Sequence, residues 1–233
     1  MSENNIIDII LLTYNNIDNT KLCINHLYRF TENFGLIVVD NNSTDGTVPY
    51  LKDIANSHTN LTLFLSPENL GCVKGRNFAY SLTNSPKVIF LDNDQFIQYG
   101  WVESYYKYFN KGYDIVGFEG WGMKKDFMPY KKVKKGEEYN YCGCGGMMIK
   151  REVIDDIGLF DEKFNPLYFE DPDLCFRAYE KGYKICWNEY QKIFHKPHKL
   201  LNSERRVYFH KSLKYFREKW KNYTPPVFIN PVI

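Results

Sequence analysis

The chain has 233 residues, of which 44% are hydrophobic and 25% are charged, enough to bury a core in one compact body. Its formal net charge of +2 is close to balanced, which argues against a protein built chiefly to coat nucleic acid. The stretch Ile6–Leu12 is too short to span a bilayer and the start MSENN does not resemble a secretory signal, so we expect a cytoplasmic protein without a transmembrane helix.

The first hundred residues alternate short β-rich runs with helical patterns. This alternation predicts an α/β fold of the Rossmann-like kind, with a mostly parallel central sheet flanked by helices and ligands at the carboxyl ends of the strands. The predicted strands are Ile6–Leu12, Leu36–Val39, Leu61–Leu65 and Lys87–Leu91, and the predicted helices are Thr20–Phe30 and Cys72–Leu82.

The second half of the chain has a looser pattern. We expect Gly122–Glu138 to form a lysine-rich loop, which is a candidate mobile flap. The last helix is predicted to be amphipathic, because apolar residues from Phe209 to Trp220 fall on one face. The other predicted elements are helices over Trp101–Phe109 and Asp171–Lys181 and strands over Asp114–Phe118 and Met147–Ile149.

An acidic triplet, Asp92-Asn93-Asp94, directly follows the apolar run Val88–Leu91. On an extended backbone, a spacing of two points both carboxylates in the same direction. Oxygen ligands at the carboxyl end of a strand suit Mg²⁺ or Mn²⁺, and such an ion can bridge a nucleotide diphosphate. A solvated turn or cap is the alternative, but the position after a buried strand favours a metal site.

A second acidic group, Glu170–Asp173 (EDPD), follows an aromatic pair and precedes a predicted helix. As a helix start, Asp171 would be the cap and Pro172 the first helical residue. As a catalytic site, the aromatic neighbours would partly desolvate a carboxylate and raise its proton affinity, as a general base for a hydroxyl group requires. The two interpretations are compatible.

Polar residues also follow the first two predicted strands, where Thr13-Tyr14-Asn15 and Asp40–Gly46 occupy the turns into the next helices. A base and ribose would lie at such positions. Asp40, at the strand's end, can accept a hydrogen bond from a base N–H or a ribose hydroxyl, whereas turn formation and capping explain Ser43–Gly46.

Glycine and cationic groups mark a third junction, Asn69–Asn77, which suits phosphate binding through backbone N–H groups and through Arg76. The chain has neither G-x-G-x-x-G nor a P-loop, so a dinucleotide enzyme or a P-loop NTPase is not favoured. Late in the chain, His195 follows an apolar pair and His198 comes three residues later. Such a histidine is either an ordinary core or surface residue or, as a neutral imidazole, a further ligand of the ion.

Taken together, these motifs resemble those of the family 2 glycosyltransferases of the GT-A fold, from Ile6 to about His198. The resemblance depends on an ordered set of motifs at family-like spacing. The set is TYNN (13–16), VVDNNSTDGT (38–47), NLGCVKGRN (69–77), FLDND (90–94), FEDPDL (169–174) and the late His195.

The resemblance implies an inverting transfer of a sugar from a nucleoside-diphosphate sugar, with a UDP-sugar as the first expectation. The acceptor would be a hydroxyl of a polysaccharide, a lipid-linked glycan or a protein glycan. Asp171 matches the position of the family's catalytic base, and Glu170 and Asp173 are rivals for that role. The residues implied to bind the nucleotide sugar are Thr13, Tyr14, Asn15, Asp40, Asn69, Arg76, Asp92 and Asn93.

The resemblance also implies a Mn²⁺ or Mg²⁺ cofactor. Asp94 would bind the ion directly, and Asp92 would contact the ion or the ribose. His195 would be a further ligand or a diphosphate contact, with His198 as the alternative. The implied organisation is a nucleotide-sugar-binding half (1–98), an acceptor-binding and catalytic-base half of the same domain (99–200), and a basic amphipathic helix with a tail (201–233).

Two other classes of protein share parts of this pattern. A sugar-phosphate nucleotidylyltransferase has the same alternation, but it would carry a glycine-rich, arginine-containing loop after the first strand, where this chain has TYNNID. A non-catalytic GT-A-like binding module would keep the fold, but the intact Asp92, Asp94 and Asp171 argue against it.

The segment Lys196–Lys221 contains nine Lys or Arg residues against two Glu, interleaved with aromatic residues. Most such runs are solvated faces of a packing helix. Peripheral contact with the inner face of the membrane is a second interpretation, because basic aromatic helices favour anionic interfaces. We expect no nucleic-acid partner, and we expect the segment Trp121–Cys144 to decide the acceptor.

Overall fold

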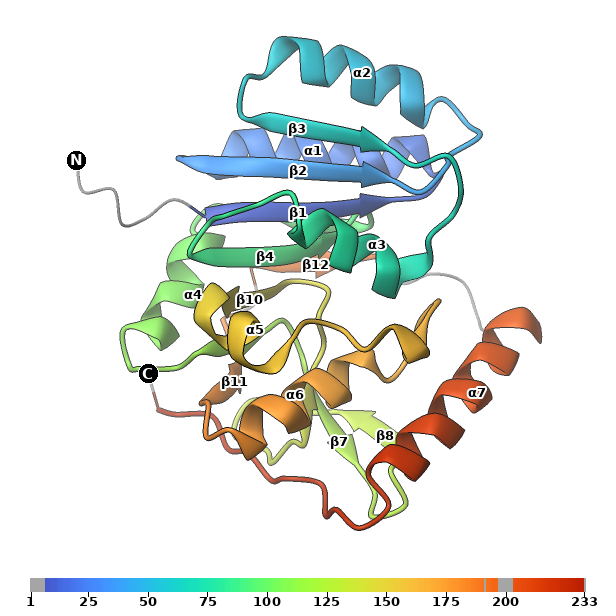
Figure 1. Ribbon diagram of the computed structural model, residues 1–233. Helices are drawn as coiled ribbons and strands as arrows, with labels where there is room; N and C mark the ends of the chain where they lie inside the picture. Colours follow the sequence, from blue (N-terminus) through green and yellow to red (C-terminus); the bar gives the residue numbers. More distant parts are fainter. Residues whose placement is uncertain (1–6, 191, 197–202, 233) are drawn as a thin grey trace.

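The computed structural model describes residues 7–190, 192–196 and 203–232. The centre of this described part is one mixed sheet of seven strands (Figure 1). In spatial order the strands are β11 (Ile185–Trp187), β6 (Ile115–Gly117), β10 (Met147–Lys150), β4 (Lys87–Asp92), β1 (Ile7–Thr13), β2 (Phe34–Asp40) and β3 (Leu61–Leu65). The first four strands of the chain run parallel, and β10 is antiparallel to both of its neighbours. The prediction of a mostly parallel sheet is confirmed.

Helices cover both faces of this sheet (Figure 1). Side chains alternate between the faces along each strand, and apolar side chains point to both faces. In β1, Ile9 and Leu11 pack in the cluster that includes Leu27. Ile10 packs in the opposite cluster, with Val73. The helices on the first face are α1 (Ile17–Phe30), α2 (Thr47–Ser57) and α4 (Trp101–Phe109), and those on the second are α3 (Gly71–Tyr80), α5 (Arg151–Ile157) and α6 (Glu170–Glu180).

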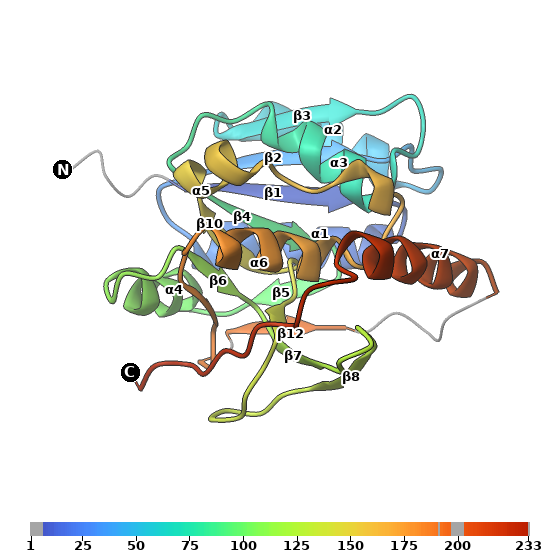
Figure 2. The ribbon, with the colours of Figure 1, turned by 60° about the horizontal axis from the view of Figure 1, so that its bottom comes forward.

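Outside the central sheet, a small three-stranded sheet lies at the bottom of Figure 2 and the C-terminal helix lies at its right. The strands are β7 (Gly120–Met123), β8 (Pro129–Lys132) and β9 (Tyr141–Cys142), and the helix is α7 (Ser203–Lys219). The prediction of a loop over Gly122–Glu138 is therefore wrong in part, since β8 pairs with β7 inside it. The sequence PYKK lacks apolar alternation, so the local pattern does not indicate this strand.

Parallel pairing places the predicted site residues at one edge of the central sheet. Thr13 lies opposite Asp40 in the register of β1 and β2, and Leu12 lies opposite Asp92 in that of β1 and β4. A separate pair of strands, β5 (Gln95–Ile97) and β12 (Ile193–His195), brings the late histidine back to the end of β4. None of the helices in the described ranges is long and apolar enough to cross a membrane.

Candidate active site

A cavity of about 450 Å³ opens where β4 ends. The predicted site residues that line it are Arg76, Asp92, Glu170, Asp171 and His195, which come from four separate segments. The other lining residues, most of them apolar or aromatic, are Cys72, Gln95, Phe118, Glu119, Trp121, Pro129, Tyr141, Gly143, Gly145, Leu167, Tyr168, Phe169, Pro172 and Phe209.

Arg76, on α3, joins the acidic groups of the cavity. Its guanidinium lies 2.7 Å from Asp92 Oδ1 and 3.5 Å from Glu170 Oε1, and the residue is buried. Gly145 approaches the same aspartate, since a Cβ atom at this position would lie 2.6 Å from Asp92 Oδ2. The glycine before β10 therefore leaves room for the Asp92–Arg76 ion pair.

The start of α6 differs from the prediction in a way that affects Asp171. Phe169, with φ of 69°, occupies the N-cap position, so Asp171 lies inside the first turn. The prediction that Asp171 caps the helix and that Pro172 is its first residue is wrong. Asp171 instead lines the cavity, next to Cys144.

Burial raises the pKa of both carboxyl groups at the start of α6. For Glu170, burial and then the charge of Asp171 raise the pKa to about 8, with Arg76 acting in the opposite direction. For Asp171, burial is again the largest cause of a raised pKa, and Arg76 again opposes it. A carboxylate with raised proton affinity is suited to accept the proton of a hydroxyl group.

Replacing Glu170 with glutamine should change how stability depends on pH. The pKa of Glu170 is raised from 4.5 to about 8, so its contribution to stability is complete below pH 4.5 and is lost as the pH rises through about 8. We therefore expect the melting temperature of the wild type, relative to Glu170→Gln, to fall across this range in a series of thermal denaturations. A difference that stays constant from pH 4.5 to 8 would contradict the raised pKa.

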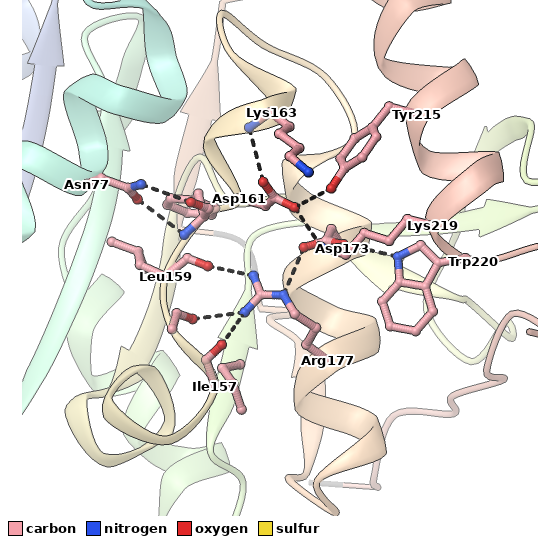
Figure 3. Close-up of polar contacts among 12 residues, drawn as sticks. Asn77, Ile157, Leu159, Asp161, Lys163, Asp173, Arg177, Tyr215, Lys219 and Trp220 are labelled. Carbon is pink, nitrogen blue, oxygen red and sulfur yellow. Dashed lines mark hydrogen bonds and ion pairs between the residues drawn. The ribbon is translucent and has the colours of Figure 1, made fainter.

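Asp173, the third acid of the motif, lies away from the cavity and holds two helices together (Figure 3). Its carboxylate is fully buried and accepts a hydrogen bond from Trp220 Nε1 at 3.0 Å. It also pairs with Arg177 at 2.8 Å and with Lys219 at 2.7 Å, which connects α6 to the end of α7. Of the three rivals for the catalytic base, only Glu170 and Asp171 face the cavity.

A neighbouring carboxylate, Asp161, completes the attachment of α7 (Figure 3). It accepts hydrogen bonds from Tyr215 Oη and Lys219 Nζ, each at 2.8 Å, and from the backbone N–H of Lys163 at 3.0 Å. Asp161→Asn should lower the free energy of unfolding by about 2 kcal/mol, because it removes a charged acceptor from this network. Denaturant unfolding would measure this loss, with Glu218→Gln on the exposed side of α7 as the control, and equal stability of both variants would contradict the anchoring role.

Asp94 and His195 lie next to each other because β5 pairs with β12. His195 is in register with Gln95, and His195 Nε2 lies 3.4 Å from Asp94 Oδ2. The hydrogen bond with Asp94 raises the pKa of His195. The structure thus brings His195 to the acidic triplet, while His198 lies outside the described residues.

The two carboxylates of the triplet do not share an extended strand, and that part of the prediction is wrong. β4 ends at Asp92, and Asn93 and Asp94 form a turn before β5. Asp92 consequently pairs with Arg76, whereas Asp94 lies against His195.

The residues predicted to hold the nucleoside form a second cluster, at the ends of β1 and β2. Asp40 is buried and accepts hydrogen bonds from Thr13 Oγ1 at 2.9 Å and from the backbone N–H of Ser43 at 2.8 Å. The backbone N–H of Asn15 donates to Ser43 Oγ at 2.7 Å, and Tyr14 is 51% exposed. These residues do not line the described cavity, so their nucleoside-binding role stays a prediction.

Asn93 connects this cluster to the cavity. Its side-chain amide donates to the backbone oxygen of Asn15 at 3.1 Å and to Thr20 Oγ1 at 2.9 Å. Asn69, by contrast, is exposed and accepts a hydrogen bond from the backbone N–H of Gly71 at 2.9 Å, in the turn before α3. Asn69 is thus away from the cavity wall.

The first turn of α3 is covered by a distant segment. The backbone N–H of Cys72 donates to the carbonyl oxygen of Pro166 at 2.8 Å, and that of Lys74 donates to Asn165 Oδ1 at 3.3 Å. These N–H groups are therefore bonded within the protein, contrary to the prediction that they are available to a phosphate. Of the cationic residues at this junction, Arg76 alone lines the described cavity.

Several residues of the cavity have no counterpart in the sequence prediction. Gln95 Oε1 accepts a hydrogen bond from the backbone N–H of Asp92 at 3.0 Å. Behind the lining residues, the buried Cys144 lies next to Asp171. The glycines at 143–146 are the one local signal that could have indicated Cys144. No local signal indicates Phe209, which reaches the cavity from α7.

The apolar face of α7 packs against the body of the molecule. Leu213 and Phe216 are buried in the core, and Phe209 lines the cavity. An anionic membrane would contact the exposed face of α7, which includes Lys211 and Lys214. Membrane contact through this helix stays a prediction.

Solved structures with the same architecture define the class of protein. GalNAc-T7 with UDP, GalNAc and Mn²⁺ superposes with a TM-score of 0.72 at 12% identity, over 84% of this chain and 44% of that one. TarS of S. aureus in complex with UDP-GlcNAc gives 0.64 at 19% identity, over 84% and 59%. The mannosyltransferase PcManGT of Pyrobaculum calidifontis with GDP-Man and Mn²⁺ gives 0.62 at 18% identity, over 78% and 54%. The fold is that of the GT-A glycosyltransferases.

The sequence gives the family within this class. The model of glycosyl transferase family 2 matches residues 8–158, so the chain belongs to glycosyltransferase family 2. It is 23% identical over 168 residues to the glycosyltransferase AglE of Haloferax volcanii, over 66% of this chain and 55% of that protein. It is also 32% identical over 75 residues to an uncharacterized glycosyltransferase of Haemophilus influenzae, over 32% of this chain and 29% of that protein. The chain thus spans little more than half the length of the Haloferax relative.

Proposed function

We propose that this protein is an inverting glycosyltransferase that moves a sugar from a nucleoside-diphosphate sugar to an acceptor hydroxyl. The main support for the proposal is the position of Asp171, a carboxylate with a raised pKa, in a cavity that is also lined by Arg76 and Asp92. Relatives of the same fold bound to UDP or GDP-Man support a nucleotide donor, and we propose a UDP-sugar first. The family membership argues against the nucleotidylyltransferase alternative.

The residues at the end of β4 fit a divalent cation. A carboxylate and an imidazole, Asp94 and His195, lie 3.4 Å apart, and Asp92, two residues before Asp94, is the last residue of β4. Carboxylate oxygen suits Mg²⁺ or Mn²⁺, and the imidazole favours Mn²⁺. The described residues contain no group of three or more His, Cys, Asp or Glu side chains that could hold a metal ion, so a cation at Asp94 and His195 would need further ligands from phosphates and water.

The proposed reaction is a single displacement at the anomeric carbon. Asp171 accepts the acceptor proton, and the acceptor oxygen bonds to the anomeric carbon as the bond to the diphosphate breaks. Arg76, already within reach of Asp92 and Glu170, provides positive charge near the leaving group. A cation held by Asp94 and His195 would neutralise further charge on the diphosphate.

A thermal-shift screen of UDP, GDP, dTDP and CDP, each with and without Mn²⁺, tests the proposed function. A bound nucleotide raises the melting temperature by mass action, and we expect the rise for UDP to depend on Mn²⁺. A protein stabilised by none of the four nucleotides under either condition would contradict the proposal. A protein that binds UDP and Mn²⁺ but neither hydrolyses nor transfers a UDP-sugar would be a binding module instead.

A further inference from the structure

The three-stranded sheet presents one face to the cavity. Trp121 on β7 lies directly opposite Tyr141 on β9 and opposite Lys132 on β8, and residues opposite each other in antiparallel strands point to the same face. Trp121 and Tyr141 both line the cavity, as does Glu119, two residues before Trp121 and paired with Lys132.

This face lies close to the proposed catalytic base. Tyr141 is buried, and after burial itself the charge of Asp171 is the next cause that raises its pKa. One strand away, Trp121 is half-buried and lines the cavity. A Cβ atom at Gly143 would lie 3.8 Å from Trp121 Nε1, in ordinary van der Waals contact with the ring, and the glycine leaves that position empty. A large, partly exposed aromatic ring thus lines the same cavity as the base.

The charges of the cavity disfavour an anionic acceptor next to Asp171. The wall carries four carboxyl groups, of which Asp92 pairs with Arg76, Glu119 pairs with Lys132, and Glu170 and Asp171 have a raised pKa. Among the described residues that line it, the cationic side chains are Arg76, which pairs with Asp92 and Glu170, and His195, which lies against Asp94. A phosphate nucleophile would find both of these cationic side chains already in contact with a carboxylate. Its repulsion by Asp171, which must be ionised to act as a base, is stronger in this partly desolvated site than in water.

Another cation, Arg205, is on α7, outside the described lining of the cavity. Its charge acts against the effect of burial on the pKa of both Cys72 and Tyr168. It is thus placed near α3 and the segment before α6, whereas the sheet face with Trp121 offers an aromatic ring and Glu119. The C–H groups on one side of a sugar ring match the electron-rich face of an aromatic ring, and a carboxylate can accept sugar O–H groups.

We infer that Trp121 is the stacking platform for the ring of an uncharged sugar, so that the acceptor presented to Asp171 is a glycan hydroxyl and not a phosphate. This inference rests on the proposed function and narrows its acceptor to a saccharide. Glu119, held by Lys132 on the same sheet face, is placed to accept hydrogen bonds from hydroxyl groups of that sugar.

Two substitutions at Trp121 and one control test the inference. Trp121→Leu keeps an apolar side chain but removes the aromatic ring, and Trp121→Phe keeps a ring. Tyr130→Leu removes an exposed aromatic ring from the same hairpin, outside the described cavity lining. The probes are a panel of neutral methyl glycosides and farnesyl phosphate, each titrated by saturation-transfer NMR in the presence of UDP and Mn²⁺. Calorimetric titration of UDP with Mn²⁺ measures donor binding separately.

We expect at least one methyl glycoside to bind the wild type and to bind Trp121→Leu about tenfold more weakly, with Trp121→Phe and Tyr130→Leu close to the wild type. UDP affinity should be equal in all four proteins. Equal glycoside binding by Trp121→Leu, or binding of farnesyl phosphate but of no glycoside, would overturn the inference. If the wild type does not bind UDP with Mn²⁺, the proposed function itself is contradicted, regardless of whether a glycoside binds.

Discussion

Asp171→Asn should retain donor binding and lose transfer by a factor of about 10²–10⁴, the range that a general base contributes. Asparagine keeps the size of the side chain but cannot accept the acceptor proton. The side chain lines the cavity and does not cap α6, so the fold should tolerate the change. Turnover of a UDP-sugar and the affinity for UDP with Mn²⁺, measured side by side, separate the two effects.

Glu170→Gln is the matched control for this substitution, because it changes the adjacent carboxylate of the same cavity. We expect a smaller loss of turnover from Glu170→Gln than from Asp171→Asn. Full turnover by Asp171→Asn would refute the base assignment. The reverse order of the two losses would transfer the role to Glu170.

Asp94→Asn should lower turnover by about 10²–10³ at a fixed Mn²⁺ concentration, because the cation that neutralises the diphosphate would be held less tightly. Higher Mn²⁺ should restore part of the activity of the variant. Addition of EDTA should abolish transfer by the wild type. Measurement of the Mn²⁺ concentration that gives half-maximal turnover tests both expectations.

Asp53→Asn, on the exposed side of α2, is the control for the Asp94 variant. It removes one negative charge at a distance from the carboxyl end of β4. A Mn²⁺ requirement that is unchanged in Asp94→Asn would contradict the role of Asp94. An unchanged requirement in Asp53→Asn would show that net charge alone is not the cause.

Much of the fold over residues 7–98 could be predicted from local sequence. The strands that end at Thr13, Asp40 and Asp92 are apolar runs followed by polar turns, and this pattern is set within each segment. Parallel pairing then forces the ends of neighbouring strands to one edge of the sheet. The edge of the sheet at which the cavity opens follows from these two facts.

Other parts of the site depend on contacts between distant segments, which local patterns do not contain. The spacing of the EDPD motif does not reveal that Asp173 is held by Lys219 and Trp220 of the C-terminal region. Likewise, the sequence predicts an anion site at the first turn of α3. In the structure, Asn165 Oδ1 accepts a hydrogen bond from the backbone N–H of Lys74 in that turn. Trp121 reaches the cavity only because β8 and β9 pair with its own strand.

A crystal structure with UDP and Mn²⁺, recorded at a wavelength where manganese scatters anomalously, is the most direct test of the proposed metal and donor site. We expect one anomalous peak in contact with a carboxylate oxygen of Asp94 and with the diphosphate, beside the cavity that holds Arg76 and Asp171. UDP bound elsewhere on the molecule, or bound in this cavity while Asp94 stays against His195 with no manganese beside it, would contradict this expectation.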